Sequence, residues 1–156
     1  MSLLRPVAIR LGRQPWLPRF ARWIVGLDRL IQRLSRGRLA LLMLAGLPEL
    51  MLTVPGRKSG LPRSTPLLYV PHPRGHLVAG SNWGDPKPPA WVANLAAADR
   101  ATVNIHGRQA TVVPKRVTGA EREQLWQHML QTWPNYAKYA ERTTREIPVF
   151  LLEPLS

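Results

Sequence analysis

A short loop rich in cations and glycine offers the clearest candidate chemistry in this sequence. Its residues are Gly56, Arg57, Lys58, Ser59 and Gly60, with Arg63 just beyond. Glycine lets a backbone approach a ligand closely, while guanidinium and ammonium groups suit phosphate or carboxylate. No Asp or Glu occurs from residue 50 to residue 84, so no acid nearby in sequence neutralises these cations. The loop therefore predicts an anion-binding site, and a solvated hairpin turn is the alternative.

Other common chemistries find little support in the sequence. The chain has no cysteine, which excludes disulfides, thiolate metal sites and cysteine nucleophiles. His72 and His76 are four residues apart, but Pro73 and Gly75 prevent the helix that would align them on a metal. The serines lack the context of a nucleophile elbow. An enzyme of this composition would need a bound cofactor to supply the reactive atom, and we expect no metal.

Positive charge is concentrated at the start of the chain. The 156 residues carry a formal net charge of +13, of which residues 1–38 contribute nine Arg and one Asp. Such a balance favours anionic partners: nucleic acid, a membrane surface or an anionic cofactor. The charge lies on one terminal segment and one loop rather than on a sheet face studded with aromatic residues. Nucleic acid is therefore an unlikely partner.

A basic amphipathic helix is predicted over residues 18–36. Its apolar stripe has helical spacing and consists of Phe20, Trp23, Ile24, Leu27, Leu30, Ile31 and Leu34. Arginines lie off this stripe, which is typical of a helix that binds an anionic membrane surface. The alternatives are packing on its own domain or on a second copy in a homodimer. Residues 1–15 are expected to be irregular.

No segment is long and apolar enough to span a membrane. The most apolar run, Leu39–Leu47, is about nine residues long, against roughly 20 for a spanning helix. We expect this run to form a short helix or an extended approach. The protein is expected in the cytoplasm, and attachment to the inner face of the cell membrane is the alternative.

The rest of the chain alternates short strands with scattered helices. Strands are predicted at about 50–54, 65–70, 76–80, 101–105, 109–117 and 147–152, and helices at 90–98, 119–133 and 135–142. About six strands without strict strand–helix alternation favour a mainly β, α+β fold: a split antiparallel barrel with flanking helices. We expect residues 1–48 to form a helical extension and residues 49–156 to form the barrel.

Three segments taken together resemble one known family. They are Val54–Arg63 with Pro66-Leu67, then Ala79–Gly84 with Pro89–Trp91 and Asn94-Leu95, then Trp133–Tyr136 with Tyr139 and the terminal Ile147-Pro148 and Glu153-Pro154. In this order and spacing they resemble the deazaflavin-dependent nitroreductase family. The resemblance runs from about Met51 to Pro154, roughly two-thirds of the chain.

The resemblance implies a fold, a cofactor and an activity. The family fold is a split β-barrel, and its cofactor is coenzyme F420, a deazaflavin with a phosphate and a polyglutamate tail. The reduced cofactor would give a hydride to a quinone, an activated enone or a nitroaromatic. One alternative is the same barrel using the flavin nucleotide FMN. The other is a basic protein without enzymatic activity that binds nucleic acid or a membrane surface.

The resemblance also assigns roles to residues. Arg57, Lys58 and Arg63 would lie along the anionic groups of the cofactor, approached by Ser59 and by the backbone of Gly56 and Gly60. The remaining cofactor contacts would come from Pro66, Gly80, Ser81, Asn82, Trp83 and Trp91. Tyr136 and Ser81 would act at the reacting centre as hydrogen-bond donors. Trp133, Tyr136 and Tyr139 would close the substrate pocket.

Overall fold

The most continuously apolar strand lies inside the sheet. In the computed structural model, which describes residues 4–34 and 46–155, strand β7 (Val149–Pro154) pairs with β6 (Arg108–Val117) on one side and with β4 (Gly75–Ala79) on the other. Residues 149–152 are all buried, because both faces of this strand are covered. The final strand predicted at 147–152 is confirmed, with a start two residues later.

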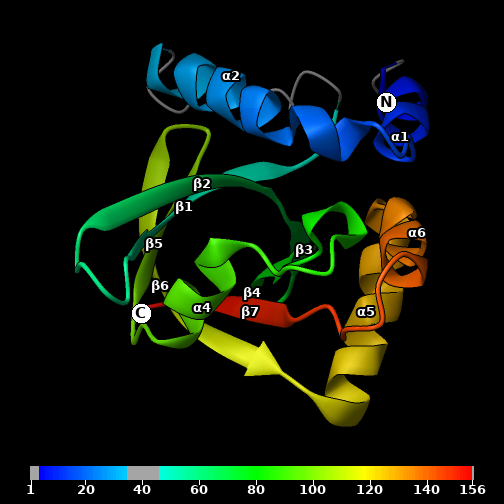
Figure 1. The fold of residues 1–156 in the computed structure, drawn as a ribbon. Coiled ribbons are helices and arrows are strands. Elements are labelled where there is room, and N and C mark those ends of the chain that lie inside the picture. Colours follow the sequence, from blue (N-terminus) through cyan, green and yellow to red (C-terminus); the bar gives the residue numbers. More distant parts are fainter. Residues whose placement is uncertain (1–3, 35–45, 156) are drawn as a thin grey trace.

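Seven strands within the described residues form one antiparallel sheet. Their order is β2–β1–β5–β6–β7–β4–β3, with β1 at Glu49–Pro55, β2 at Pro62–Leu68, β3 at Val70–His72 and β5 at Ala101–Ile105. Figure 1 shows the sheet curling from β2 through β5 to β7, with helix α4 (Ala90–Ala96) inside the curl. The predicted split barrel is confirmed. No strand was predicted at β3, which pairs with β4 in the structure.

Each face of the sheet buries its own apolar cluster. Inside the curl, Trp91 and Leu95 of α4 pack with Phe150 and Leu152 of β7. On the other face, α5 (Gly119–Thr132) and α6 (Asn135–Glu141) cover Val149 and Leu151. Successive side chains of β7 thus point alternately into one cluster and the other, because side chains alternate between the two faces of a strand.

The N-terminal segment is more ordered than its composition predicts. The expectation of an irregular start is wrong, because residues Arg5–Gly12 form helix α1, followed by a 3₁₀ turn η1 (Leu17–Phe20) and helix α2 (Ala21–Leu34). Asn135 of α6 donates to the carbonyl of Ile9 at 2.8 Å and accepts from the Arg13 guanidinium at 2.8 Å. These long-range hydrogen bonds hold the start of the chain against α6, in a way that local sequence pattern does not reveal. The predicted segment at 39–47 lies largely outside the described residues, as do the last two residues, 35 and 36, of the predicted basic helix.

Helix α2 turns a partly polar face toward the barrel. Asp28 and Gln32 are buried, whereas Trp23 is 80% exposed and Leu34 is 77% exposed. Of the predicted apolar stripe, only Ile24 and Ile31 are half-buried. Figure 1 places α2 across the barrel on the side of β2. The exposed outer face is therefore the more apolar one. No helix in the described ranges is long and apolar enough to cross a membrane.

Candidate active site

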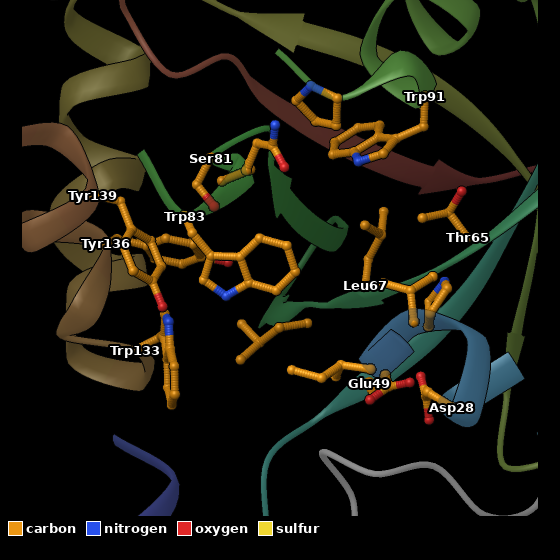
Figure 2. Close-up of a pocket in the computed structure, with 17 residues that line it drawn as sticks. Asp28, Glu49, Thr65, Leu67, Ser81, Trp83, Trp91, Trp133, Tyr136 and Tyr139 are labelled. Carbon is orange, nitrogen blue, oxygen red and sulfur yellow. The ribbon is translucent and has the colours of Figure 1, made fainter. Parts of the chain in front are cut away.

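A cavity of about 270 Å³ lies where α2, β2, α4 and α6 approach one another. Its walls are largely aromatic and aliphatic, and its lining residues are Ile24, Val25, Asp28, Glu49, Thr65, Pro66, Leu67, Leu68, Ala79, Ser81, Asn82, Trp83, Pro89, Trp91, Trp133, Tyr136 and Tyr139. A pocket that is mostly apolar with a few polar groups is the usual form of a small-molecule site. Figure 2 shows the Trp83 indole in its middle, between the tyrosines of α6 and the side chains of β2.

The two tyrosines of α6 have different hydrogen-bonding states. The Tyr139 hydroxyl donates to the Gly12 carbonyl at 2.9 Å, so it ties α6 to the end of α1. Within the described residues, the Tyr136 hydroxyl makes no hydrogen bond, although Tyr136 is only 4% exposed. Burial raises the pKa of Tyr136 well above its ordinary value near 10, with a smaller contribution from Tyr139. Tyr136 therefore offers the pocket a protonated phenol that is free to donate.

Three consecutive residues with positive φ place Trp83 in the pocket. The φ angles of Asn82, Trp83 and Gly84 are 45°, 53° and 82°, within the 3₁₀ turn η2 (Asn82–Gly84). A left-handed backbone is costly for a non-glycine residue, at roughly 1–3 kcal/mol each. At Gly84 a side chain is also excluded, because a Cβ would lie 2.5 Å from the Tyr139 carbonyl oxygen. Surrounding contacts must therefore hold this turn in place.

Arg145 supplies those contacts. Its guanidinium donates to the carbonyls of Gly80 at 3.1 Å, Ser81 at 2.9 Å and Asp85 at 3.0 Å. Arg142 adds a hydrogen bond to the Trp83 carbonyl at 3.2 Å. A guanidinium group has five N–H donors in one plane, so it can donate to several carbonyl oxygens at once. This role of Arg145 was not predicted from the sequence, where the residue is simply a cation shortly before the last strand.

The cationic loop lies outside the lining of the pocket. It joins β1 to β2 and is closed by its own hydrogen bonds, from the Gly56 amide to the Leu61 carbonyl and from the Gly60 amide to the Gly56 carbonyl, both at 2.8 Å. The Ser59 hydroxyl accepts from the Leu61 amide at 3.2 Å. A Cβ at Gly56 would lie 2.8 Å from the Ser59 hydroxyl, so a larger residue there would displace that hydroxyl. The loop is thus a preformed turn.

The cations of this loop stay exposed and unneutralised. In the part of the chain that the structure describes, no carboxylate pairs with Arg57, Lys58 or Arg63. The Asn94 side-chain oxygen instead accepts from the Arg57 amide at 3.1 Å and from its guanidinium at 3.3 Å. Asn94 belongs to α4, the helix that places Trp91 in the pocket. One helix therefore positions both the loop and a wall of the pocket.

The structure brings together some of the predicted site residues and separates others. The pocket lining includes Pro66, Ser81, Asn82, Trp83, Trp91, Trp133, Tyr136 and Tyr139. The lining does not include Gly56, Arg57, Lys58, Ser59, Gly60, Arg63 or Gly80. Gly80 is a packing residue, because a Cβ there would lie 2.5 Å from the Val92 side chain and 2.9 Å from Pro148.

Two acids of the lining were missed by sequence reasoning. Gln32 donates from its amide nitrogen to Asp28 at 3.1 Å and to Glu49 at 2.7 Å. The carboxyl-bearing residues are 4% and 3% exposed, respectively. Figure 2 shows Asp28 and Glu49 on the opposite side of the pocket from Tyr136 and Tyr139. Two features of the sequence could have pointed to these acids. Asp28 lies on helix α2 away from the apolar stripe, and Glu49 is the last acid before the acid-free stretch from residue 50 to residue 84.

Comparisons with known proteins agree on one family. Residues 28–154 match the model of the F420H(2)-dependent quinone reductase family. An F420H(2)-dependent quinone reductase of Mycobacterium tuberculosis (strain H37Rv) is 33% identical over 125 residues, which cover 78% of this chain and 84% of that protein.

Two solved structures are similar to this chain. One is described as an F420-H2 dependent reductase; it is 34% identical, with a TM-score of 0.63, and the match covers 68% of this chain and 94% of that one. The other is described as a domain-swapped dimer; it is 30% identical, with a TM-score of 0.66, and the match covers 82% and 94%.

Proposed function

Because the chain belongs to the F420H(2)-dependent quinone reductase family, we propose that it transfers a hydride from reduced coenzyme F420 to a quinone held in the aromatic pocket. The single observation that carries this proposal is the Tyr136 hydroxyl, which lines an apolar cavity, belongs to a buried residue and has no hydrogen bond to any described residue. Activated enones and nitroaromatics are further acceptors of the same electronic class. The family assignment makes the protein an oxidoreductase and F420 its cofactor.

The residues present fit such a cofactor. Arg57, Lys58 and Arg63 are exposed and unpaired among the described residues, and they suit phosphate and carboxylate groups. The loop is preformed, so little ordering entropy opposes anion binding. Pro66, Ser81 and Trp91 offer flat or hydrogen-bonding surface for a ring system. When bound, the reduced deazaflavin supplies the hydride.

The chain's own contribution to the chemistry is orientation and a hydrogen-bond donor. Reduction of a quinone adds a hydride to the ring system and a proton to a carbonyl oxygen, which gains negative charge first. The Tyr136 phenol stays protonated and can donate to that oxygen. The aromatic walls exclude water and hold the acceptor flat, which favours a reactive geometry. Ser81 is a second candidate donor in the lining.

A direct assay tests this function. Purified protein is mixed with reduced F420 and 2-methyl-1,4-naphthoquinone, and the return of the oxidised deazaflavin absorbance is followed. We expect turnover with reduced F420 and much slower turnover with reduced FMN or NADH, because the cationic loop suits a polyanionic tail. Equal rates with reduced FMN would favour the flavin alternative, and no rate with any donor would contradict the enzyme assignment.

We further propose that α1, η1 and α2 dock this enzyme on an anionic membrane surface. The exposed large apolar side chains of this segment are Leu4, Val7, Leu11, Trp16, Phe20, Trp23, Leu27, Leu30 and Leu34. So many exposed apolar side chains in one segment favour an interaction site. The exposed arginines Arg19, Arg22, Arg29 and Arg33 accompany it. Apolar area together with cations matches the interface of an anionic bilayer, where each cation contributes about 1 kcal/mol.

Surface substitutions on the full chain test this docking. Deleting the segment would also remove the Gly12 carbonyl that Tyr139 binds, so we prefer Trp23→Gln combined with Leu34→Gln. The unmodified protein should sediment with vesicles containing phosphatidylglycerol at low salt, and the double variant should not. Val113→Thr, at an exposed apolar site on β6, is the matched control.

Two outcomes would contradict membrane docking. The first is an unmodified protein that ignores anionic vesicles at low salt. The second is a dimer in solution that the double variant converts to a monomer, because a second copy would then cover this face. Light scattering measures the mass of each variant and distinguishes the second outcome.

A further inference from the structure

Arg142 joins the aromatic pocket to the N-terminal segment. One nitrogen of its guanidinium donates to the Trp83 carbonyl at 3.2 Å, and another donates to the carbonyl of Arg13, the residue that caps the end of α1. Trp83 lines the pocket, whereas Arg142 and Arg13 do not. A guanidinium is a rigid fork of donors, so it holds two carbonyls at a fixed separation, which a flexible ammonium group cannot do. Arg142 is therefore a bridge between the η2 turn and α1.

The η2 turn packs directly against the residues around this bridge. A Cβ at Gly84 would lie 2.5 Å from the Tyr139 carbonyl oxygen and 2.7 Å from the Arg142 Cβ. The guanidinium carbon of Arg142 lies 5.6 Å from the centre of the Tyr139 ring. Trp83 has a φ of 53°, which a non-glycine residue keeps where surrounding contacts impose it. Arg142 supplies the contact at the Trp83 carbonyl, whereas Arg145 binds carbonyls before and after it.

The other end of the bridge is held on α6. The Arg13 guanidinium donates to the Asn135 side-chain oxygen at 2.8 Å, and Asn135 is fully buried. The Tyr139 hydroxyl donates to the Gly12 carbonyl at 2.9 Å. These hydrogen bonds fix the end of α1, and with it the carbonyl that Arg142 binds. The bridge therefore starts from a well-anchored point.

We propose that Arg142 is a positioning residue for the acceptor, because it fixes the Trp83 indole relative to the end of α1. This inference rests on the proposed function, since it concerns the acceptor in the same pocket. Figure 2 shows the indole between the α6 tyrosines and the side chains of β2, so a displaced indole changes the surface that a flat acceptor meets. The end of α1 thus contributes to acceptor binding without lining the pocket.

The position of Trp83 can be tested without turnover. The full chain is labelled with fluorotryptophan, and the fluorine NMR signal of Trp83 is identified by its absence in Trp83→Phe. We expect Arg142→Ala to shift and broaden this signal, because one anchor of the turn is lost. Arg13→Ala should have a smaller effect of the same kind, because it loosens the end of α1 through Asn135, which lies outside the pocket lining. Lys138→Ala, at an exposed cation on α6, is the matched control and should leave the signal unchanged.

Kinetics test the consequence for the acceptor. Because one hydrogen bond changes affinity by roughly three- to tenfold, Arg142→Ala should raise the KM for the quinone by about that factor, with little change in kcat or cofactor affinity. Arg142→Lys keeps the charge but not the fork, so it should restore KM only in part. If Arg142 acts through Trp83, the rise in KM should nearly vanish in a Trp83→Ala background, which a double-mutant cycle measures. Lys138→Ala should leave KM unchanged.

The outcomes separate this inference from the proposed function. An unmoved Trp83 signal in folded Arg142→Ala, or an equal rise in KM with and without the Trp83 indole, would overturn the positioning role. A displaced Trp83 signal in a protein that reduces no quinone would instead overturn the proposed function and leave the bridge intact. If Arg142→Ala fails to fold, Arg13→Ala and Arg142→Lys decide by the same NMR measurement, and a Trp83 signal unmoved in both contradicts the inference.

Discussion

The cationic loop between β1 and β2 and the aromatic pocket differ in how they are built. The loop is local: Gly56, Ser59 and Gly60 close it through hydrogen bonds within six residues. The pocket is assembled from α2, the strands β1, β2 and β4, the η2 turn, α4 and α6, which are far apart in sequence. The loop is exposed and charged, whereas the pocket is buried and mostly apolar.

This difference indicates that the loop and the pocket have separate roles. Exposed cations attract and hold anionic groups over a distance that salt shortens. A buried phenol acts only on atoms that touch it, in surroundings where its hydrogen bond is stronger than in water. The loop should therefore govern affinity and the pocket should govern the chemical step. Substitutions in one region should leave the other property nearly unchanged.

The largest effect is expected from Tyr136→Phe. Loss of the phenol removes the donor to the developing negative charge, so turnover should fall roughly 10–1,000-fold while cofactor affinity changes little. Steady-state kinetics and a cofactor binding titration measure the two properties. Tyr69→Phe is the matched control, because Tyr69 is absent from the pocket lining. Full turnover in the Tyr136 variant would leave that residue a packing side chain.

The converse effect is expected from Arg57→Ala combined with Lys58→Ala. Each lost charge-assisted contact should weaken cofactor binding by about 1–3 kcal/mol, and the salt dependence of binding should flatten. Turnover at saturating cofactor should stay close to that of the unmodified protein. The pair Arg100→Ala and Arg108→Ala removes the same charge from exposed sites elsewhere. Equal affinity in both double variants would show that the loop is an ordinary surface turn.

A smaller effect is expected from Arg145→Lys, which tests the support of the pocket. One ammonium cannot satisfy the three carbonyls that Arg145 binds, so the free energy of unfolding should fall by about 1–3 kcal/mol. Trp83 and Ser81 would lose their fixed positions, and turnover should decrease while loop-dependent affinity is kept. Denaturant titration and kinetics measure these changes. Arg116→Lys, exposed on β6, should change neither.

The smallest effect concerns pH. Burial raises the pKa of Tyr136 in the folded protein above its ordinary value near 10, so folding favours the neutral phenol. The resulting stability is fully present below pH 10 and is lost as pH rises from there through the folded-state pKa. Denaturant titrations between pH 8 and 11 should show a steeper alkaline loss in the unmodified protein than in Tyr136→Phe. Parallel curves would contradict the neutral, buried state of this phenol.

Much of the architecture followed from the sequence because it depends on local patterns. Strands were predicted at 101–105 and 109–117, and the structure joins β5 and β6 through His106 and Gly107, whose positive φ angles suit a two-residue turn. A strand was also predicted at 147–152, where the apolar residues of β7 lie. Strand β3 was missed because three residues beside a proline turn give no periodicity; its pairing with β4 creates it.

Helix α2 shows where local pattern reaches its limit. Its periodicity predicts a helix with an apolar stripe, but periodicity cannot say which face meets the barrel. In the structure, Asp28 and Gln32 are buried and Ile24 is half-buried, whereas Trp23 and Leu34 are exposed. On the inner face, Gln32 donates to Glu49 on β1 and to Asp28, a contact with the barrel that periodicity cannot predict.

The cationic loop, most strands and the family resemblance were predictable, because each depends on residues close together in the chain. Three features became visible in the folded protein alone: Asp28 and Glu49 line the pocket, Tyr139 is tied to Gly12 while the Tyr136 hydroxyl makes no hydrogen bond among the described residues, and Arg145 supports the turn carrying Trp83. Hydrogen bonds and burial depend on distance in space, and these partners lie more than fifteen residues apart in sequence, so local patterns cannot identify them.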